Sequence, residues 1–186
     1  MKTDKLDYDL PIELIAQHPA AKRTDSRLLV LHRRSGDIID SRFERLADFL
    51  SPGDCLILNN TKVLPARFFA RRVTGGRIEG LFLAESSPCV WEVMLKGSRK
   101  LRAGDILHLK DRNRNDFCRA GLLEKAGQGR CLLKVETDAD AQSVLEIIGF
   151  PPLPPYIKRD DDPALAKEDR VRYQTVYARV NGAVAA

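Results

Sequence analysis

Side chains suited to binding a polar ligand follow directly after a short apolar run. Residues 55–58 (C-L-I-L) are opened by a Pro-Gly-Asp turn and predict a strand buried on both faces. Four hydrogen-bonding side chains come next: Asn59, Asn60, Thr61 and Lys62. Such groups line ligand crevices where buried strands of α/β proteins end, and Arg67 adds a planar cation suited to carboxylate or phosphate. The alternative is an Asn-rich turn that satisfies its own backbone.

A second polar block lies near the other end of the sequence. Residues 149–159 hold four of the ten prolines and predict a stiff, extended connector. Residues 172–179 (R-Y-Q-T-V-Y-A-R) follow with aromatic and cationic side chains. Because the segment between the two blocks has a different composition, we interpret it as a domain inserted between two halves of another.

The elements that position these side chains are predicted to form an α/β (α+β) fold. A hairpin near residues 27–40, a helix at 42–50 and the strand at 55–58 indicate an α/β domain. Short strands separated by Gly turns follow from residue 68 to 136 and predict a small antiparallel β-barrel. We expect residues 1–67 to form the first part of the α/β domain, 68–137 the inserted barrel, and 138–186 the return, which looks incomplete at Ala186.

Composition places the chain among water-soluble folded proteins. Of 186 residues, 44% are hydrophobic and 31% charged, and no apolar run reaches the ~20 residues of a membrane span. The N-terminus lacks the apolar core of a signal peptide, so we expect a cytoplasmic protein without membrane contact. Four cysteines and three histidines show no metal-binding spacing, and Cys55 and Cys131 are predicted to be core residues, so we expect no metal.

Positive charge is concentrated in the predicted barrel. From residue 62 to 119 there are thirteen Lys and Arg against six Asp and Glu, whereas the whole chain has a net charge of +5. Arg71, Arg72 and Arg77 lie near the tip of the first barrel hairpin. A basic excess on a β-rich segment indicates a phosphate-bearing partner. A solvated surface that happens to be basic is the alternative.

Seven sequence blocks are distinctive when they are taken together. In chain order they are D-Y-D-L-P-I-E-L-I-A-Q-H-P, R-L-L-V-L, P-G-D-C-L-I-L-N-N-T-K-V-L-P-A-R, G-G-R-I-E-G-L, W-E-V-M-L-K, P-L-P-P-Y-I and R-Y-Q-T-V-Y-A. Together they resemble the S-adenosylmethionine:tRNA ribosyltransferase-isomerase family of queuosine biosynthesis. Asn60 and Lys62 stand where the family also uses Asp and Arg, and both keep their hydrogen-bonding capacity. Family members continue with a P-T-A-G-L-H-F block after the alanines, so we expect the catalytic machinery in this chain to be incomplete.

The resemblance implies a reaction and its partners. The family transfers the ribosyl part of S-adenosylmethionine, used as a substrate, to 7-aminomethyl-7-deazaguanine at the tRNA wobble position. The group isomerises to epoxyqueuosine, with release of adenine and methionine, and the full-length protein is expected to be a monomer.

The resemblance also suggests roles for individual residues. The catalytic candidates are Arg67, Tyr156 and Arg172, and the tRNA-binding candidates are Arg71, Arg72 and Arg77. The substrate-binding candidates are Asn59, Asn60, Thr61, Lys62, Tyr173, Gln174 and Tyr177. Arginines suit anionic groups and tyrosines suit stacking on a purine. Two alternatives stay open: a basic β-barrel RNA-binding module without chemistry, and an inert truncation product.

Overall fold

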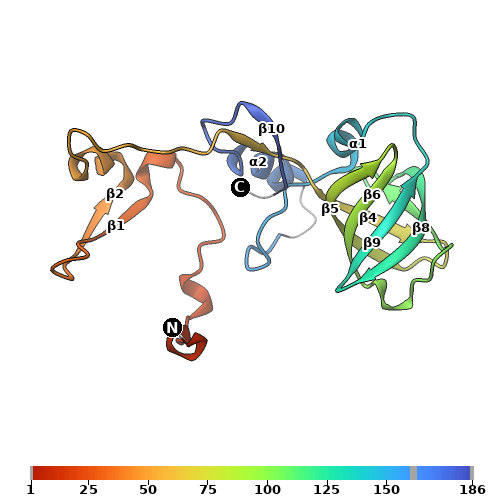
Figure 1. Ribbon diagram of the computed structural model, residues 1–186, viewed down its shortest axis with the longest axis horizontal. Helices are drawn as coiled ribbons and strands as arrows, with labels where there is room; N and C mark the ends of the chain where they lie inside the picture. The colour runs from red at the N-terminus through yellow and green to blue at the C-terminus, as the bar shows by residue number, and fades with distance from the viewer. Residues whose placement is uncertain (1, 160–162, 185–186) are drawn as a thin grey trace. The chain divides into compact units, whose positions relative to one another are not determined.

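The computed structural model describes residues 2–159 and 163–184, which divide into two compact units (Figure 1). The first unit is Met1–Ile57 with Pro155–Lys158, and the second is Leu58–Pro154 with Arg159–Ala186, each within the described ranges. The second unit contains the buried core. The mixture of a closed barrel, small sheets and few helices confirms the predicted α+β class.

A closed barrel of six antiparallel strands dominates the second unit. The strands are β4 (Arg67–Arg72), β5 (Arg77–Ser87), β6 (Val90–Lys96), β7 (Ile106–Lys110), β8 (Asp116–Gly127) and β9 (Arg130–Val135). Their order around the barrel is β4-β5-β6-β9-β8-β7, and β7 pairs back onto β4. The sequence prediction of a small barrel is confirmed. In β6 the alternation is also as predicted, with Trp91, Val93 and Leu95 buried inside.

Aromatic side chains fill the barrel interior. Trp91 meets Phe68 and Phe82 edge to face, with ring centroids 6.1 and 5.3 Å away. The Phe68 ring lies against the backbone of Gly80, where an added Cβ would come within 2.2 Å of a ring carbon. Gly80 therefore makes room for Phe68, because packing this dense leaves no space for even one more carbon.

Helix α1 (Ala141–Ile148) adds Ala141, Val144, Leu145 and Ile148 to the same core. Asp140 caps its first turn by accepting a hydrogen bond from the Ser143 amide at 2.9 Å. That bond, with a second from the Ser143 hydroxyl, lowers the pKa of the Asp140 carboxyl. After the helix, Gly149 approaches Pro65 so closely that a Cβ would lie 1.9 Å from the Pro65 carbonyl oxygen.

A two-stranded parallel sheet stands apart from the barrel strands in the hydrogen-bonding pattern. It pairs β3 (Thr61–Val63) with β10 (Val180–Ala183). Helix α2 (Pro163–Arg172) comes between them in sequence. The three elements bring residues near 60 and near 175 into the same region of the second unit.

The first unit holds one antiparallel hairpin, β1 (Arg27–Leu31) with β2 (Ile38–Arg42), as the sequence predicted. Its helices are short 3-10 turns: η1 (Thr3–Leu6), η2 (Ile12–Leu14), η3 (Arg23–Asp25) and η4 (Phe43–Phe49). A fifth, η5 (Ser98–Lys100), belongs to the barrel connections. None of the described residues of this unit is buried. No helix in the part of the chain that the structure describes is long and apolar enough to cross a membrane.

The predicted buried strand at residues 55–58 is wrong. No strand forms there, Ile57 is 89% exposed, and Cys55 is exposed instead of lying in a core. An apolar run becomes a strand only when a neighbouring strand takes its backbone hydrogen bonds. Among the described residues no segment pairs with this run. Cys131, by contrast, is buried in the barrel as expected.

Candidate functional site

The polar run after residue 58 makes a turn that leads into β3. The Asn59 side-chain oxygen accepts a hydrogen bond from the Thr61 amide at 2.9 Å, which is the self-satisfying turn of the alternative interpretation. The Asn60 carbonyl accepts from the amides of Arg179 and Val180 at 2.7 and 3.2 Å. Thr61 and Lys62 then pair with β10. The run thus lies beside the second polar block.

Gln174 joins the two blocks through both halves of its side-chain amide. Its oxygen accepts from the Val63 amide at 2.9 Å, and its nitrogen donates to the Val63 carbonyl at 2.7 Å. The side chain therefore replaces a missing strand neighbour at the end of β3. Both amide groups of Gln174, whose role in binding substrate stays a prediction, thus bond to Val63 in this structure.

Arg67 is the first residue of β4 and has contacts with three other residues. Its Nε donates to Glu79 at 2.7 Å, and its guanidinium lies 5.1 Å from the centroid of the Phe69 ring. Its backbone exchanges two hydrogen bonds with Phe150. The guanidinium is thus a fixed, half-exposed cation on the barrel wall. Its partners account for its orientation without a ligand.

The remaining predicted residues are divided between the two units. Tyr156 belongs to the first unit, where its carbonyl accepts from Gln17 at 3.1 Å. Arg172 and Tyr173 lie at the end of α2 in the second unit, and the Tyr173 amide donates to the Asp169 carbonyl. Tyr177 is exposed nearby in sequence. The structure therefore joins Gln174 to β3 and places Tyr156 in the other unit.

An ion pair that sequence reasoning missed anchors α2. Arg159 donates to both carboxylate oxygens of Asp169, at 2.8 and 3.0 Å, and both side chains are largely buried. The hydrogen bond that Arg159 donates to Asp169 raises the pKa of Arg159. Two parallel bonds of this kind fix orientation as well as distance. The pair joins Arg159, at the end of the proline-rich segment, to α2.

Two rows of outward side chains cross the barrel in strand register. We call the first the mixed row: Lys96, Glu79, Phe69, Lys110 and Asp116, on β6, β5, β4, β7 and β8. Its carboxylates each serve two cations, since Glu79 contacts Arg67 and Lys96 while Asp116 contacts Lys110 and Arg71. The hydrogen bond from Lys110 is the main reason why the pKa of Asp116 is lowered.

We call the second the basic row: Arg77, Arg71, His108 and Arg119, on β5, β4, β7 and β8. It contains no carboxylate. Arg72, the third predicted tRNA-binding residue, ends β4 and donates to the Lys100 carbonyl at 3.5 Å. Arg71 on β4 therefore lies opposite Arg77 on β5, and Arg72 follows Arg71 at the end of β4.

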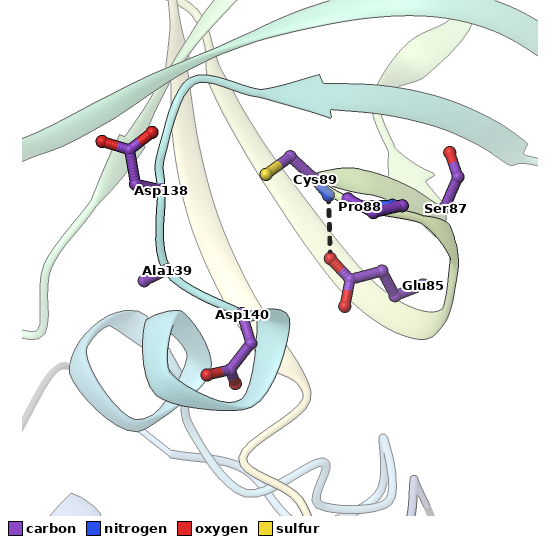
Figure 2. A pocket seen from close by; sticks show the side chains of 7 residues that line it. All are labelled: Glu85, Ser87, Pro88, Cys89, Asp138, Ala139 and Asp140. Atoms are coloured by element: carbon purple, nitrogen blue, oxygen red, sulfur yellow. Dashed lines mark hydrogen bonds between the residues drawn. The ribbon is translucent and has the colours of Figure 1, made fainter.

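An acidic depression of 420 Å³ lies elsewhere on the barrel unit (Figure 2). It is lined by Glu85, Ser87, Pro88, Cys89, Asp138, Ala139 and Asp140. The Glu85 carboxylate accepts from the Cys89 amide at 2.9 Å, the bond drawn in Figure 2, and Asp140 caps α1. Two of its three carboxylates thus stabilise local backbone. Within the described residues, no group of three or more His, Cys, Asp or Glu side chains is placed to hold a metal ion.

Comparison with known proteins decides the family. The family model described as "Queuosine biosynthesis protein" matches residues 3–186. The chain belongs to the queuosine biosynthesis protein family. Two similar proteins, from Halothermothrix orenii and Francisella tularensis subsp. novicida, are each called S-adenosylmethionine:tRNA ribosyltransferase-isomerase. Each is 42% identical, over 100% of this chain and 52% of its own length.

This queuosine biosynthesis family chain thus spans about half the length of the curated relatives it matches. A solved structure, of an S-adenosylmethionine tRNA ribosyltransferase from Thermotoga maritima, is 29% identical. The match covers 94% of this chain and 56% of that chain, with a TM-score of 0.38.

His108 and Arg119 are the members of the basic row that sequence reasoning missed in this family chain. Leu107 and Leu109 are buried on either side of His108, so His108 faces outward. The outward direction of His108 could therefore have been predicted from the sequence. Its neighbour in the row could not have been predicted, because the register between strands sets Arg119 opposite His108. Register depends on how the barrel closes and cannot be read from one strand.

Proposed function

We propose that this chain supplies the tRNA-binding barrel and part of the substrate site of an S-adenosylmethionine-dependent tRNA ribosyltransferase-isomerase. The observation that carries the proposal is 42% identity along the whole chain to proteins of that name. In the proposed reaction the ribosyl group of S-adenosylmethionine moves to 7-aminomethyl-7-deazaguanine at the tRNA wobble position. Isomerisation gives epoxyqueuosine, and adenine and methionine leave. We place this monomeric activity in the cytoplasm, without a metal.

The proposed reaction needs particular chemical groups, and the candidate residues supply some of them. The sulfonium acidifies the carbon bonded to it, so a base can remove a proton there and begin the rearrangement. The methionine carboxylate needs a cation, for which Arg172 and Arg67 are the candidates. Thr61 and Lys62 offer polar groups to the ribose or base, and Tyr156, Tyr173 and Tyr177 offer stacking. In this proposal Gln174 acts through β3, because Val63 takes both of its amide groups.

Adenine release tests the proposal. We would build a chimera in which these 186 residues replace the matching part of the Halothermothrix orenii relative, and supply S-adenosylmethionine labelled in its adenine. Release that needs both S-adenosylmethionine and substrate tRNA is the expected result. The unaltered relative is the positive control, and the 186-residue chain alone is expected to release no adenine.

The second candidate is an RNA-binding module without chemistry, favoured by the basic row alone. A chimera that melts cooperatively and binds tRNA, yet releases no adenine while the unaltered relative does, would support this candidate over the enzyme. Cooperative melting is needed in that comparison because an unfolded chimera would also be inactive.

A further inference from the structure

The basic row places basic side chains opposite one another across four consecutive strands. Arg71 pairs with Arg77 on one side and with His108 on the other, and His108 pairs with Arg119. With neighbouring strands ~4.8 Å apart, the four positions span ~14 Å. The row therefore gathers three arginines and a histidine on one side of the barrel.

The carboxylates beside Arg71 and Arg119 neutralise only part of the charge of these two residues. Arg71 contacts Asp116 at 3.3 Å, but Asp116 also contacts Lys110. Arg119 lies 3.8 Å from Glu136, and both side chains are half exposed. At such exposure, solvent weakens ion pairs strongly. A positive surface therefore remains around Arg71 and Arg119, on β4 and β8.

The neighbourhood of the row extends this positive surface. The Arg114 guanidinium lies 3.8 Å from the centroid of the Phe69 ring, and Arg77 lies 5.8 Å from the same centroid. Stacking on Phe69 orients these planar cations on the outside of a rigid barrel. Planar guanidinium groups held in this way match the oxygens of phosphate.

The side of the barrel opposite β4, around β9, has a different arrangement of cations. Strand β9 lies three positions from β4 in either direction around the closed barrel. Its exposed cations Arg130 and Lys134 lie opposite no basic residue in strand register, and Lys134 donates to the Pro88 carbonyl at 3.0 Å. Pro88 also lines the acidic depression. A polyanion is therefore favoured on the β4 side of the barrel.

We propose that the basic row binds the sugar-phosphate backbone of tRNA, with His108 and Arg119 as contact residues beside Arg71 and Arg77. The inference rests on the proposed function for the identity of the RNA. Phosphate contacts of this kind fix where the RNA lies and carry no sequence information. The row therefore positions the tRNA body, and the choice of wobble base belongs to other residues.

Two double variants, each of which removes two positive charges, test where on the barrel tRNA binds. Arg71→Ala/Arg77→Ala removes two cations from the row, and Arg130→Ala/Lys134→Ala removes two from the neighbourhood of β9. Binding of a fluorescently labelled, unmodified tRNA transcript to the full 186-residue chain is measured by anisotropy from low to high salt. We expect the row variant to bind at least ~10-fold more weakly at low salt, with a salt slope smaller by about two. The β9 variant should stay within about twofold of the wild type.

His108→Glu separates binding from folding. A carboxylate at this position lies opposite both Arg71 and Arg119, so it adds favourable opposite-charge pairs to the row. We expect this variant to melt at the same temperature as the wild type or higher, while binding tRNA more weakly. A variant that merely unfolds would lose affinity and melting temperature together.

Three results would overturn the inference: equal losses in the two double variants, unchanged affinity in His108→Glu, or no salt-sensitive binding by the wild-type chain. None of them depends on adenine release. Conversely, loss of binding in the row variants together with an inactive, folded chimera would keep the row as a tRNA site and remove the proposed reaction.

Discussion

The barrel and the first unit begin from similar sequence patterns and differ in what they bury. In β9 the alternation places Cys131, Leu133 and Val135 inside a closed core. In β1 the less exposed face, with Leu28 and Val30, is only partly buried, and Leu29 and Leu31 on the other face are 61% and 55% exposed. Each barrel strand has two neighbours, whereas β1 has only β2 among the described strands. Alternation thus sets the side to which a residue points, and closure of the sheet decides whether that side is dry.

The largest expected difference comes from the same substitution in both regions. Leu133→Ala leaves a cavity in the closed core and should lower the free energy of unfolding by about 2–5 kcal/mol. Leu31→Ala removes a side chain that water already reaches and should stay within about 0.5 kcal/mol. Urea unfolding of both variants gives the two values. Equal losses would mean that the first unit buries Leu31 in solution and that the comparison fails.

A smaller effect tests how tightly the barrel is packed. Gly80→Ala puts a Cβ 2.2 Å from the Phe68 ring and should cost about 1–3 kcal/mol, because the core must shift. Gly76→Ala is the control, since its Cβ would meet only the flexible Arg72 side chain at 3.3 Å. Adding Phe68→Leu to Gly80→Ala should cost less than the sum of the single changes. Strict additivity would show that the ring and the glycine are not coupled.

The barrel was predictable because its information is local. Strand spacing, Gly turns and the alternation in β6 each follow from a few neighbouring residues. The strand at 55–58 failed because its existence depends on a partner that no local pattern reveals. The contacts of the candidate residues divide in the same way: the sequence placed Arg71 and Arg77 near a hairpin tip, and their role in binding tRNA stays a prediction. His108 and the Arg159–Asp169 pair required register and tertiary contact.

Gln174 shows a different limit of sequence reasoning. An amide beside tyrosines and arginines is a sound candidate for binding substrate, and its residue type fits that role. The structure shows two hydrogen bonds from this side chain to Val63, 111 positions away in the sequence, which its residue type alone does not reveal. Residue type states which bonds a side chain can make, and the fold decides which partner takes them.

The smallest predicted effect concerns the reactivity of two cysteine thiols. It involves no change in folding at neutral pH. Cys55 is exposed, whereas burial, with a contribution from Glu136, raises the pKa of Cys118 to about 11. Because only the thiolate reacts, about one in a thousand Cys118 thiols is reactive at pH 8. Iodoacetamide should therefore label Cys55 at least ~10-fold faster than Cys118, as peptide mass spectrometry would show.

The same shift gives this comparison a dependence on pH. An unfolded thiol has a pKa of ~8.5, so between roughly pH 8.5 and 11 the unfolded chain releases the Cys118 proton more readily than the folded one. The free energy of unfolding should fall as pH rises through that range, and the fall should be smaller in Cys118→Ala. Labelling of Cys118 as fast as Cys55 at pH 8, in a chain that still melts cooperatively, would mean that this part of β8 opens to solvent as readily as the first unit does.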